Sequence, residues 1–167
     1  TISPLINLKT PIPNCFLSSI FWTASWIIDL KRYLPGSNHE DPIYQMHYLE
    51  NPYTSDEKAF QEMIRLCKEN PSHMMGGASI GWVNAALDSV NMLWKNETLD
   101  NIQVPVLIAT GGEDGVVDVS YNEIFSNALK QSKHLYYKNA RHELFREEKE
   151  IRDAWWKDFD AFISEML

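Results

Sequence analysis

The sequence predicts an α/β fold, in which a parallel sheet near the C-terminus follows a long helical region. Three observations support this prediction. Residues 104–109 (VPVLIA) are a continuous apolar run of strand length, typical of a parallel strand that is covered on both faces. Residues 102–167 alternate strand, loop and helix twice, which is the order of a parallel α/β unit. Residues 8–101 carry patterns that are almost wholly helical.

The first part of the chain is expected to leave a sheet and enter a helix. Residues 1–7 resemble the end of a buried strand, and two prolines then break the chain. Asn14 is the expected cap of a helix that runs to about Lys31. Apolar residues lie on more than one face of that helix: Phe16, Ile20, Phe21, Trp22, Trp26, Ile27 and Ile28. Such a helix is either buried or faces an apolar ligand. Its uncharged run, residues 15–28, is too short to span a bilayer.

Two further helices are expected between residues 54 and 101. Thr54 and Glu57 have the spacing of a capping box, which predicts the start of a helix. Apolar residues follow at helical spacing: Phe60, Met63, Ile64 and Cys67. Asn70-Pro71 should end this helix, and Gly76-Gly77 marks a break. The next helix is indicated by another set at helical spacing: Val83, Leu87, Val90 and Trp94.

The C-terminal part is expected to contain two strands, each followed by a loop and a helix. A tight glycine-rich loop follows the strand at 104–109, and Ser120 with Glu123 has the spacing of a second capping box. Residues 134–137 are the expected second strand, and a loop follows over residues 139–143. The final helix is strongly amphipathic. Its apolar face consists of Ile151, Ala154, Trp155, Phe159, Phe162, Ile163 and Met166.

The composition is that of an ordinary globular protein and excludes some classes of partner. Of the 167 residues, 44% are hydrophobic and 23% are charged, which argues against disorder. A net charge of -8 argues against nucleic acid, because a phosphate backbone requires a basic surface. The histidines show no HxxxH or HExxH spacing, so no metal is expected. Cys15 and Cys67 form no CxxC pair, which favours a reduced, cytoplasmic location and leaves a single disulfide as the alternative.

Two candidate catalytic residues follow neighbouring strands, at the edge where functional residues of open α/β sheets gather. Asp114 follows the first strand and His142 the second. An acid that orients a histidine, which in turn takes the proton of a serine, forms a Ser-His-acid triad. Singly, such residues commonly have only turn and loop roles, but their placement on adjacent loops favours catalysis. Glu113 and Asp118 are rival acids, although Asp118 is better explained as lying just before the helix that Ser120 caps.

Several segments carry a resemblance to a known family. Residues 104–118 (VPVLIATGGEDGVVD) and 139–147 (NARHELFRE) resemble the acid and histidine segments of the lysophospholipase L2 and monoacylglycerol lipase group of α/β-hydrolases. Residues 3–6 (SPLI) resemble the strand end that follows the nucleophile helix in that group. Residues 51–56 (NPYTSD) and Gly81-Trp82 resemble cap motifs of the lysophospholipase L2 branch. The resemblance covers essentially the whole chain.

This resemblance implies the C-terminal part of an α/β-hydrolase parallel sheet with an inserted helical cap. Residues 1–7 and 102–167 would belong to the core, and residues 8–101 to the cap. The implied activity is the hydrolysis of lysophospholipid or monoacylglycerol-like esters, with Asp114 as acid, His142 as base and no cofactor. The family places its GxSxG elbow and oxyanion loop before the segment that matches residue 1. The serine is therefore expected upstream, and the isolated chain is expected to be inactive.

Another serine formally matches the nucleophile motif. Residues 77–81 (GASIG) fit GxSxG, and Ser79, Asp114 and His142 follow the chain order of α/β-hydrolases. The elbow requires a buried strand immediately before the serine. The preceding residues 69–75 (ENPSHMM) contain a proline and no β-branched run, and the resemblance assigns them to the cap. Ser79 is therefore interpreted as a cap residue.

One alternative belongs to another class of function: the chain could be a truncated, catalytically inactive relative that serves as a binding or interaction module. A third possibility is that the chain is a fragment of a longer protein. A parallel sheet cut after its central strands would expose an unpaired edge and an apolar face, which favours association through that edge. The expected partners are a lipid-like ester and, for the apolar helix, the surface of a membrane.

Overall fold

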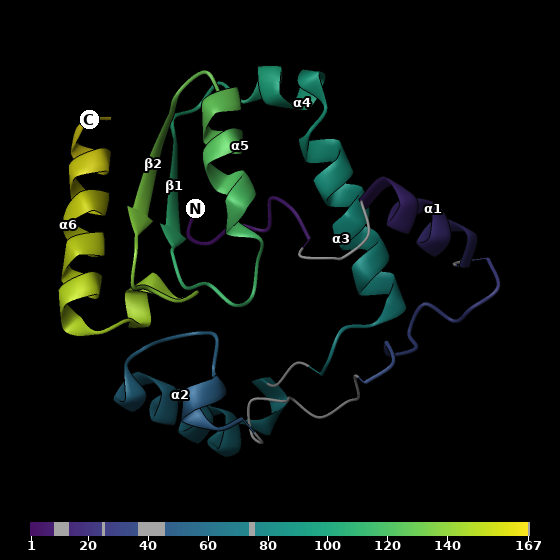
Figure 1. Cartoon of the computed structure of the whole chain (residues 1–167), viewed down its shortest axis with the longest axis horizontal. Coiled ribbons are helices and arrows are strands. Elements are labelled where there is room, and N and C mark those ends of the chain that lie inside the picture. The colour runs from purple at the N-terminus through teal and green to yellow at the C-terminus, as the bar shows by residue number, and fades with distance from the viewer. Residues whose placement is uncertain (9–13, 25, 37–45, 74–75, 167) are drawn as a thin grey trace.

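The computed structural model describes residues 1–8, 14–24, 26–36, 46–73 and 76–166. Its sheet consists of two parallel strands, β1 (Val106–Gly111) and β2 (Ser132–Tyr137) (Figure 1). Val106 pairs with Ser132, and the register continues to Gly111 and Tyr137. Pro105 has no N–H, so the ladder begins at Val106, whose N–H donates to the carbonyl of Gln131 at 3.0 Å. The predicted parallel pair is confirmed.

Residues 1–7 lie beside the free edge of β1. Ile2 forms a parallel bridge with Ala109, and the N–H of Ser3 donates to the carbonyl of Ala109 at 2.8 Å. Ile6 is buried against Ile108 on one face of the sheet. The N-terminal segment therefore pairs with the sheet in the direction of a third parallel strand.

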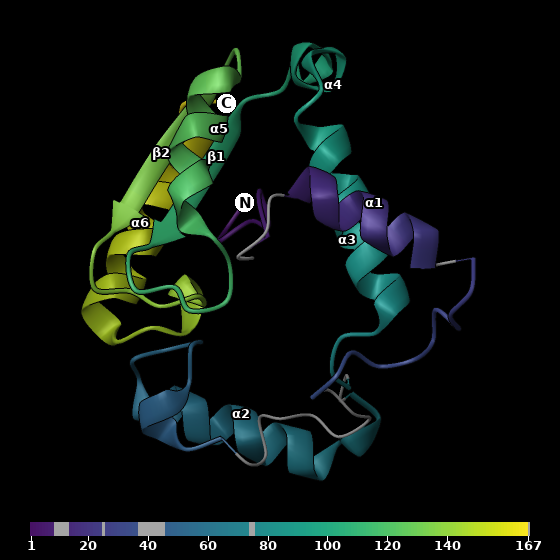
Figure 2. The same cartoon turned by 45° about the vertical axis from the view of Figure 1, so that its right-hand side comes forward.

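Helices cover both faces of the strand pair, as Figures 1 and 2 show. On one face, α5 (Asn122–Ala128) buries Phe125 against Ile108. On the other face, α6 (Lys149–Ser164) buries Trp155 and Phe162 against alternate residues of β1. Removal of such aromatic side chains from water stabilises each layer by about 1.5–3 kcal/mol per residue. Together these layers hold the loops after β1 and β2 at one edge of the sheet.

The remaining helices precede the sheet in the sequence. They are α1 (Asn14–Ala24), α2 (Glu57–Glu69), α3 (Ile80–Leu93) and α4 (Asn96–Asn101). Helix α1 packs on α3, where Asn91 Nδ2 donates to Ser18 Oγ at 2.7 Å (Figure 2). Trp94, at the end of α3, donates from Nε1 to the carbonyl of Ile6 at 3.0 Å and stacks edge-on against Phe125. These contacts join α3 to the sheet.

Short 3-10 turns connect several of these elements. They lie at Tyr48–Glu50, Pro71–His73, Val119–Tyr121 and Leu144–Arg146. Residues 9–13, 25, 37–45, 74–75 and 167 lie outside the described part of the chain. The two prolines predicted to break the chain fall among them, and the side chain of Cys15, half of the disulfide alternative, is not described either.

The first helix is shorter than predicted. Helix α1 ends at Ala24, whereas the sequence pattern predicts a helix to about Lys31. Residues 30–34 instead pair with the start of α3: Gly81 N–H donates to the carbonyl of Leu30 at 2.8 Å, and Ile80 N–H to that of Arg32 at 2.9 Å. These backbone hydrogen bonds hold residues 30–34 outside the helix.

Apolar side chains around α1 are exposed, as expected for a helix that faces an apolar ligand or surface. Trp22 is 62% exposed, Trp26 77% and Ile27 85%. Within the described part of the chain, every helix is too short or too polar to cross a membrane.

The capping box predicted at Thr54 is wrong. Helix α2 begins at Glu57, and the carboxylate of Asp56 accepts hydrogen bonds from the N–H groups of Lys58 and Ala59. A carboxylate at this position also interacts favourably with the helix dipole. The hydroxyl of Thr54 is instead fully buried and donates to the carbonyl of Arg146 at 2.8 Å.

The capping box predicted at Ser120 is wrong for the same reason. Asp118 caps the turn at Val119–Tyr121, and its Oδ1 accepts from the N–H of Ser120 at 3.2 Å and from the Ser120 hydroxyl at 2.6 Å. Helix α5 then begins at Asn122. An aspartate immediately before the first helical residue therefore takes the capping role at both of these starts.

Candidate active site

Asp114 lies in the loop after β1, and its carboxylate is held by the backbone that follows it. The side chain is 0% exposed. Its Oδ1 accepts from the N–H groups of Val116 and Val117 at 2.8 and 3.1 Å. These two hydrogen bonds occupy Oδ1 as an acceptor, and they orient the other carboxylate oxygen, Oδ2, toward the next loop.

His142 lies in that next loop, after β2. Its Nδ1 is 2.8 Å from Asp114 Oδ2, and its side chain is 23% exposed. An ionised carboxylate only accepts hydrogen bonds, so Nδ1 carries the proton of this bond. In the neutral ring, Nε2 then presents a lone pair that can accept a proton. The structure thus brings together the two residues that the sequence predicts as an acid–base pair.

The two loops approach each other through a glycine pair. A Cβ at Gly111 would lie 2.1 Å from the carbonyl oxygen of Arg141, and one at Gly112 would lie 2.3 Å from that of Lys138. Real Cβ atoms do not come so close, so only glycine fits here without a backbone shift. The GG of the acid segment therefore allows Asp114 to reach His142.

The pKa of Asp114 reflects opposing effects. Burial alone raises the pKa of this carboxyl. The hydrogen bonds from His142, Val116 and Val117 act in the other direction and outweigh burial, so the pKa of Asp114 lies below its ordinary value. Asp114 is therefore ionised at neutral pH, as the orienting acid of a histidine must be.

The rival acids have other partners. Asp118 binds Ser120, as described above, and its Oδ2 accepts from Asn7 Nδ2 at 3.4 Å. Glu113 is exposed, and its backbone N–H donates to the carbonyl of Ala140 at 2.8 Å. The acid hydrogen-bonded to His142 is therefore Asp114.

Ser79 occupies a helix start and not a nucleophile elbow. Its Oγ caps α3 and accepts from the N–H of Trp82 at 3.2 Å. Its φ of -89° and ψ of 162° are ordinary extended values. The backbone at Ser79 forms an antiparallel bridge with Tyr33 and does not follow a strand of the parallel sheet. The buried strand and strained turn of an elbow are thus absent at this described position.

Two titratable groups beside the histidine loop also show shifted pKa values. Burial raises the pKa of Glu143, and electrostatic interactions with Arg146 and His142 only partly oppose this increase. Burial and a 2.7 Å hydrogen bond to Asp158 raise the pKa of Tyr137. The phenol of Tyr137 therefore stays protonated and serves as a donor that fixes α6 to β2.

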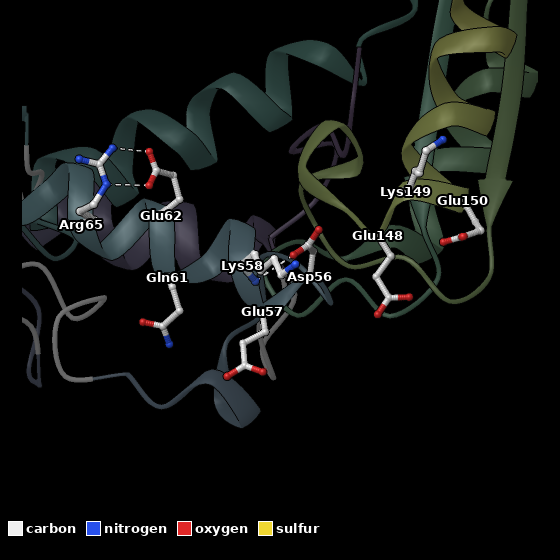
Figure 3. A pocket seen from close by; sticks show the side chains of 9 residues that line it. All are labelled: Asp56, Glu57, Lys58, Gln61, Glu62, Arg65, Glu148, Lys149 and Glu150. Atoms are coloured by element: carbon white, nitrogen blue, oxygen red, sulfur yellow. Dashed lines mark hydrogen bonds and ion pairs between the residues drawn. The ribbon is translucent and has the colours of Figure 1, made fainter.

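A charged hollow lies between the starts of α2 and α6 (Figure 3). Its volume is about 760 Å³. It is lined by Asp56, Glu57, Lys58, Gln61, Glu62, Arg65, Glu148, Lys149 and Glu150. Neither Asp114 nor His142 lines it, and its charged walls do not suit an acyl chain. An apolar hollow of about 550 Å³ lies instead along α1 and is lined by Ser19, Ile20, Thr23, Ile27 and Ile28.

Sequence reasoning missed the contact between the histidine loop and residues 51–55. The N–H of His142 donates to the carbonyl of Pro52 at 3.3 Å, and that of Glu143 donates to Tyr53 at 2.8 Å. Both segments carry motifs that the sequence analysis singled out, NPYTSD and NARHELFRE. Nothing in either motif reveals that they pair, because they lie about 90 residues apart in the chain.

Known proteins show the same combination of sequence and fold. Residues 1–149 match the family described as serine aminopeptidase, S33. The probable lysophospholipase L2 of Haemophilus influenzae is 26% identical over 135 residues, which is 80% of this chain and 41% of that protein.

Solved structures of two lipases share the fold. A soluble variant of monoglyceride lipase from Saccharomyces cerevisiae, in complex with a substrate analogue, matches 99% of this chain and 55% of its own, with a TM-score of 0.68 and 16% identity. Monoacylglycerol lipase from Paleococcus ferrophilus matches 99% of this chain and 56% of its own, with a TM-score of 0.62 and 17% identity.

These likenesses confirm the predicted α/β fold with its parallel sheet, and the predicted resemblance to the lysophospholipase L2 and monoacylglycerol lipase group. The chain spans about half the length of the proteins that it matches, or less.

Proposed function

Because the chain belongs to the serine aminopeptidase S33 family of hydrolases, we propose that it supplies the acid and the base of a serine-hydrolase triad. Asp114 is the acid and His142 is the base. The 2.8 Å hydrogen bond between Asp114 Oδ2 and His142 Nδ1, at the carboxyl edge of the parallel strands, carries this proposal. It leaves Nε2 as the atom that takes the proton of the serine.

The reaction proceeds through an acyl-enzyme. The serine, which we place outside these 167 residues, attacks the ester carbonyl while His142 Nε2 accepts its proton. His142 then protonates the leaving alcohol and afterwards activates the water that releases the acid. Asp114 stabilises the imidazolium at each of these steps, and the mechanism requires no metal or organic cofactor.

The proposed substrates are lysophospholipid or monoacylglycerol-like esters. This choice is supported by the names of the relatives, a probable lysophospholipase and two monoacylglycerol lipases. It is also supported by the apolar hollow along α1, because pockets for greasy ligands are lined mainly by apolar side chains. We assign residues 8–101 to a cap and residues 1–7 and 102–167 to the hydrolase core. We also propose a cytoplasmic location with peripheral contact to a membrane surface, where such lipids are found.

A substrate comparison tests the proposal. Full-length protein should hydrolyse a lysophospholipid and a monoacylglycerol, as measured by release of fatty acid, while the 167-residue chain alone should not exceed a buffer control. Preferential hydrolysis of an aminoacyl amide would keep the triad and overturn the assignment of lipid esters. Hydrolysis by the isolated chain would overturn the placement of the serine.

Ser79→Ala is expected to leave kcat of the full-length protein nearly unchanged. The substitution removes a helix cap, so the free energy of unfolding should fall by about 0.5–2 kcal/mol without loss of the reaction. The measurement is kcat with a monoacylglycerol, together with thermal unfolding. Ser120→Ala, which removes an exposed hydroxyl bound to Asp118, is the matched control. If Ser79→Ala abolishes activity and Ser120→Ala does not, Ser79 is the nucleophile.

A further inference from the structure

Glu147 carries a carboxylate that is completely buried beside the histidine loop. It lies just before α6, and the whole residue is 0% exposed. Its Oε1 accepts from the N–H of Arg141 at 2.6 Å. Its Oε2 accepts from the N–H of Ser55 at 3.0 Å and from the Ser55 hydroxyl. One side chain therefore connects the residue before His142 with the segment 51–55.

Each described hydrogen bond of this carboxylate is donated by a backbone N–H or a hydroxyl. The remaining donor is the N–H of Glu148, at 3.4 Å from Oε2. Among the described residues, no Lys, Arg or His forms an ion pair with Glu147. A buried charge without such a partner is costly unless its oxygens are fully hydrogen-bonded. This site thus requires a side chain that presents two acceptor oxygens. A glutamine of equal shape would place its NH2 group against the N–H of Arg141 or of Ser55, which are also donors.

Further bonds fix the same two segments to each other. Arg141 Nη1 donates to the carbonyls of Asn51 and Thr54 at 2.9 and 3.0 Å. Asn51 Oδ1 accepts from the N–H groups of Tyr53 and Thr54, both at 3.0 Å, which holds segment 51–55 in a tight turn. Asn51 and Thr54 are buried. The segment that presents its carbonyls to the histidine loop is therefore itself rigidly held.

The backbone at His142 and at its two neighbours is held by this arrangement. The N–H groups of residues 141, 142 and 143 donate, in order, to Glu147 Oε1, to the carbonyl of Pro52 and to that of Tyr53. The first bond is made by Glu147 directly. The other two are made by the segment that Glu147 holds through Ser55. The direction of the His142 ring therefore depends on Glu147 as well as on Asp114.

We propose that Glu147 is a positioning residue that holds His142 in register with both Asp114 and segment 51–55. This inference rests on the proposed function of His142 as the base. Its consequence is that residues 51–55, assigned to the cap, form part of the scaffold of the base. A displacement of this segment would move Nε2 relative to the serine, and misplacement by about 1 Å can lower a rate by roughly 100-fold.

The test compares Glu147→Gln with Glu148→Gln in the full-length protein. Glu148 is the exposed neighbour and serves as the matched control. Glu147→Gln should lower kcat by roughly 10–100-fold with KM within about twofold, because the base is displaced while the substrate site is kept. By NMR, the proton shared by His142 Nδ1 and Asp114 should shift or broaden. Glu148→Gln should change neither kcat nor that resonance.

Two results would overturn the proposal. One is a kcat for Glu147→Gln that equals that of Glu148→Gln. The other is a lower kcat with an unchanged Nδ1 proton resonance, which would indicate a role apart from His142. If Glu147→Gln does not fold, Ser55→Ala decides, since it removes one donor and keeps the backbone: a smaller fall in kcat with a shifted resonance supports the proposal, and wild-type values for both overturn it.

The experiment also separates this inference from the proposed function. If wild-type protein hydrolyses no ester, or His142→Ala retains activity, the proposed function fails. The NMR comparison still decides whether Glu147 positions His142, because that resonance reports the hydrogen bond and not the reaction.

Discussion

His142→Ala is expected to lower kcat of the full-length protein by about 10⁴–10⁶-fold. Without the imidazole, no group takes the proton of the attacking serine or returns it to the leaving alcohol. KM should change little, because the residue acts on the proton and not on the acyl chain. The fold should persist, since the side chain of His142 is partly exposed and, among the described residues, is hydrogen-bonded to Asp114 alone. The measurement is kcat with a monoacylglycerol, alongside circular dichroism.

His47→Ala is the matched control for this substitution. His47 is exposed, and its Nδ1 accepts from the N–H of Leu49 at 3.3 Å. Its removal should leave kcat within about twofold of wild type, as for other surface positions away from a site. A His142→Ala protein that keeps more than a tenth of wild-type kcat would show that another group is the base.

Asp114→Asn is expected to lower kcat by about 10⁴-fold while the geometry stays intact. The amide oxygen can still accept from Val116 and Val117, so the amide nitrogen would face His142. That nitrogen is a donor, which forces Nδ1 to become the acceptor and places the ring proton on Nε2. A ring protonated at Nε2 cannot accept the proton of the serine. The measurement is kcat near neutral pH, with Asp118→Asn as the control that should stay within about tenfold of wild type.

The same substitution should alter the stability at acidic pH. The pKa of Asp114 is lower in the folded chain than in the unfolded chain. Its stabilising contribution is therefore complete above the unfolded value, about 3.9, and is lost as the pH falls through the lower folded value. Asp114→Asn should remove this part of the pH dependence in unfolding curves below about pH 5. An unchanged acid limb would contradict the assigned role of these hydrogen bonds.

The parallel strands and the proximity of Asp114 to His142 could be predicted from the sequence because both depend on local patterns. A continuous apolar run predicts β1, and the carboxyl ends of neighbouring parallel strands lie at the same edge, so Asp114 and His142 meet there. The end of α1 could not be predicted in this way. Its apolar pattern continues past Ala24, but the backbone pairing of residues 30–34 with α3 decides where the helix ends.

The role of Glu147 was hidden for a related reason. In the sequence it is one of several acidic residues before an amphipathic helix, where exposed charges are common. Its buried carboxylate accepts hydrogen bonds from Ser55, 92 residues away, and from the Arg141 amide. Only the folded chain brings these donors together. The capping boxes were wrong on a smaller scale, since in both places an aspartate two residues from the expected cap takes the capping role.

The close approach at Gly111 and Gly112 has a consequence for protein engineering. Because a side chain at either position would collide with the carbonyl oxygens of Arg141 or Lys138, the acid loop and the histidine loop share one surface. A designer who transplants the Asp–His pair into another scaffold must therefore transfer both loops as one cassette, with the glycines included. Libraries that randomise one loop alone would consist mostly of variants whose two loops no longer fit.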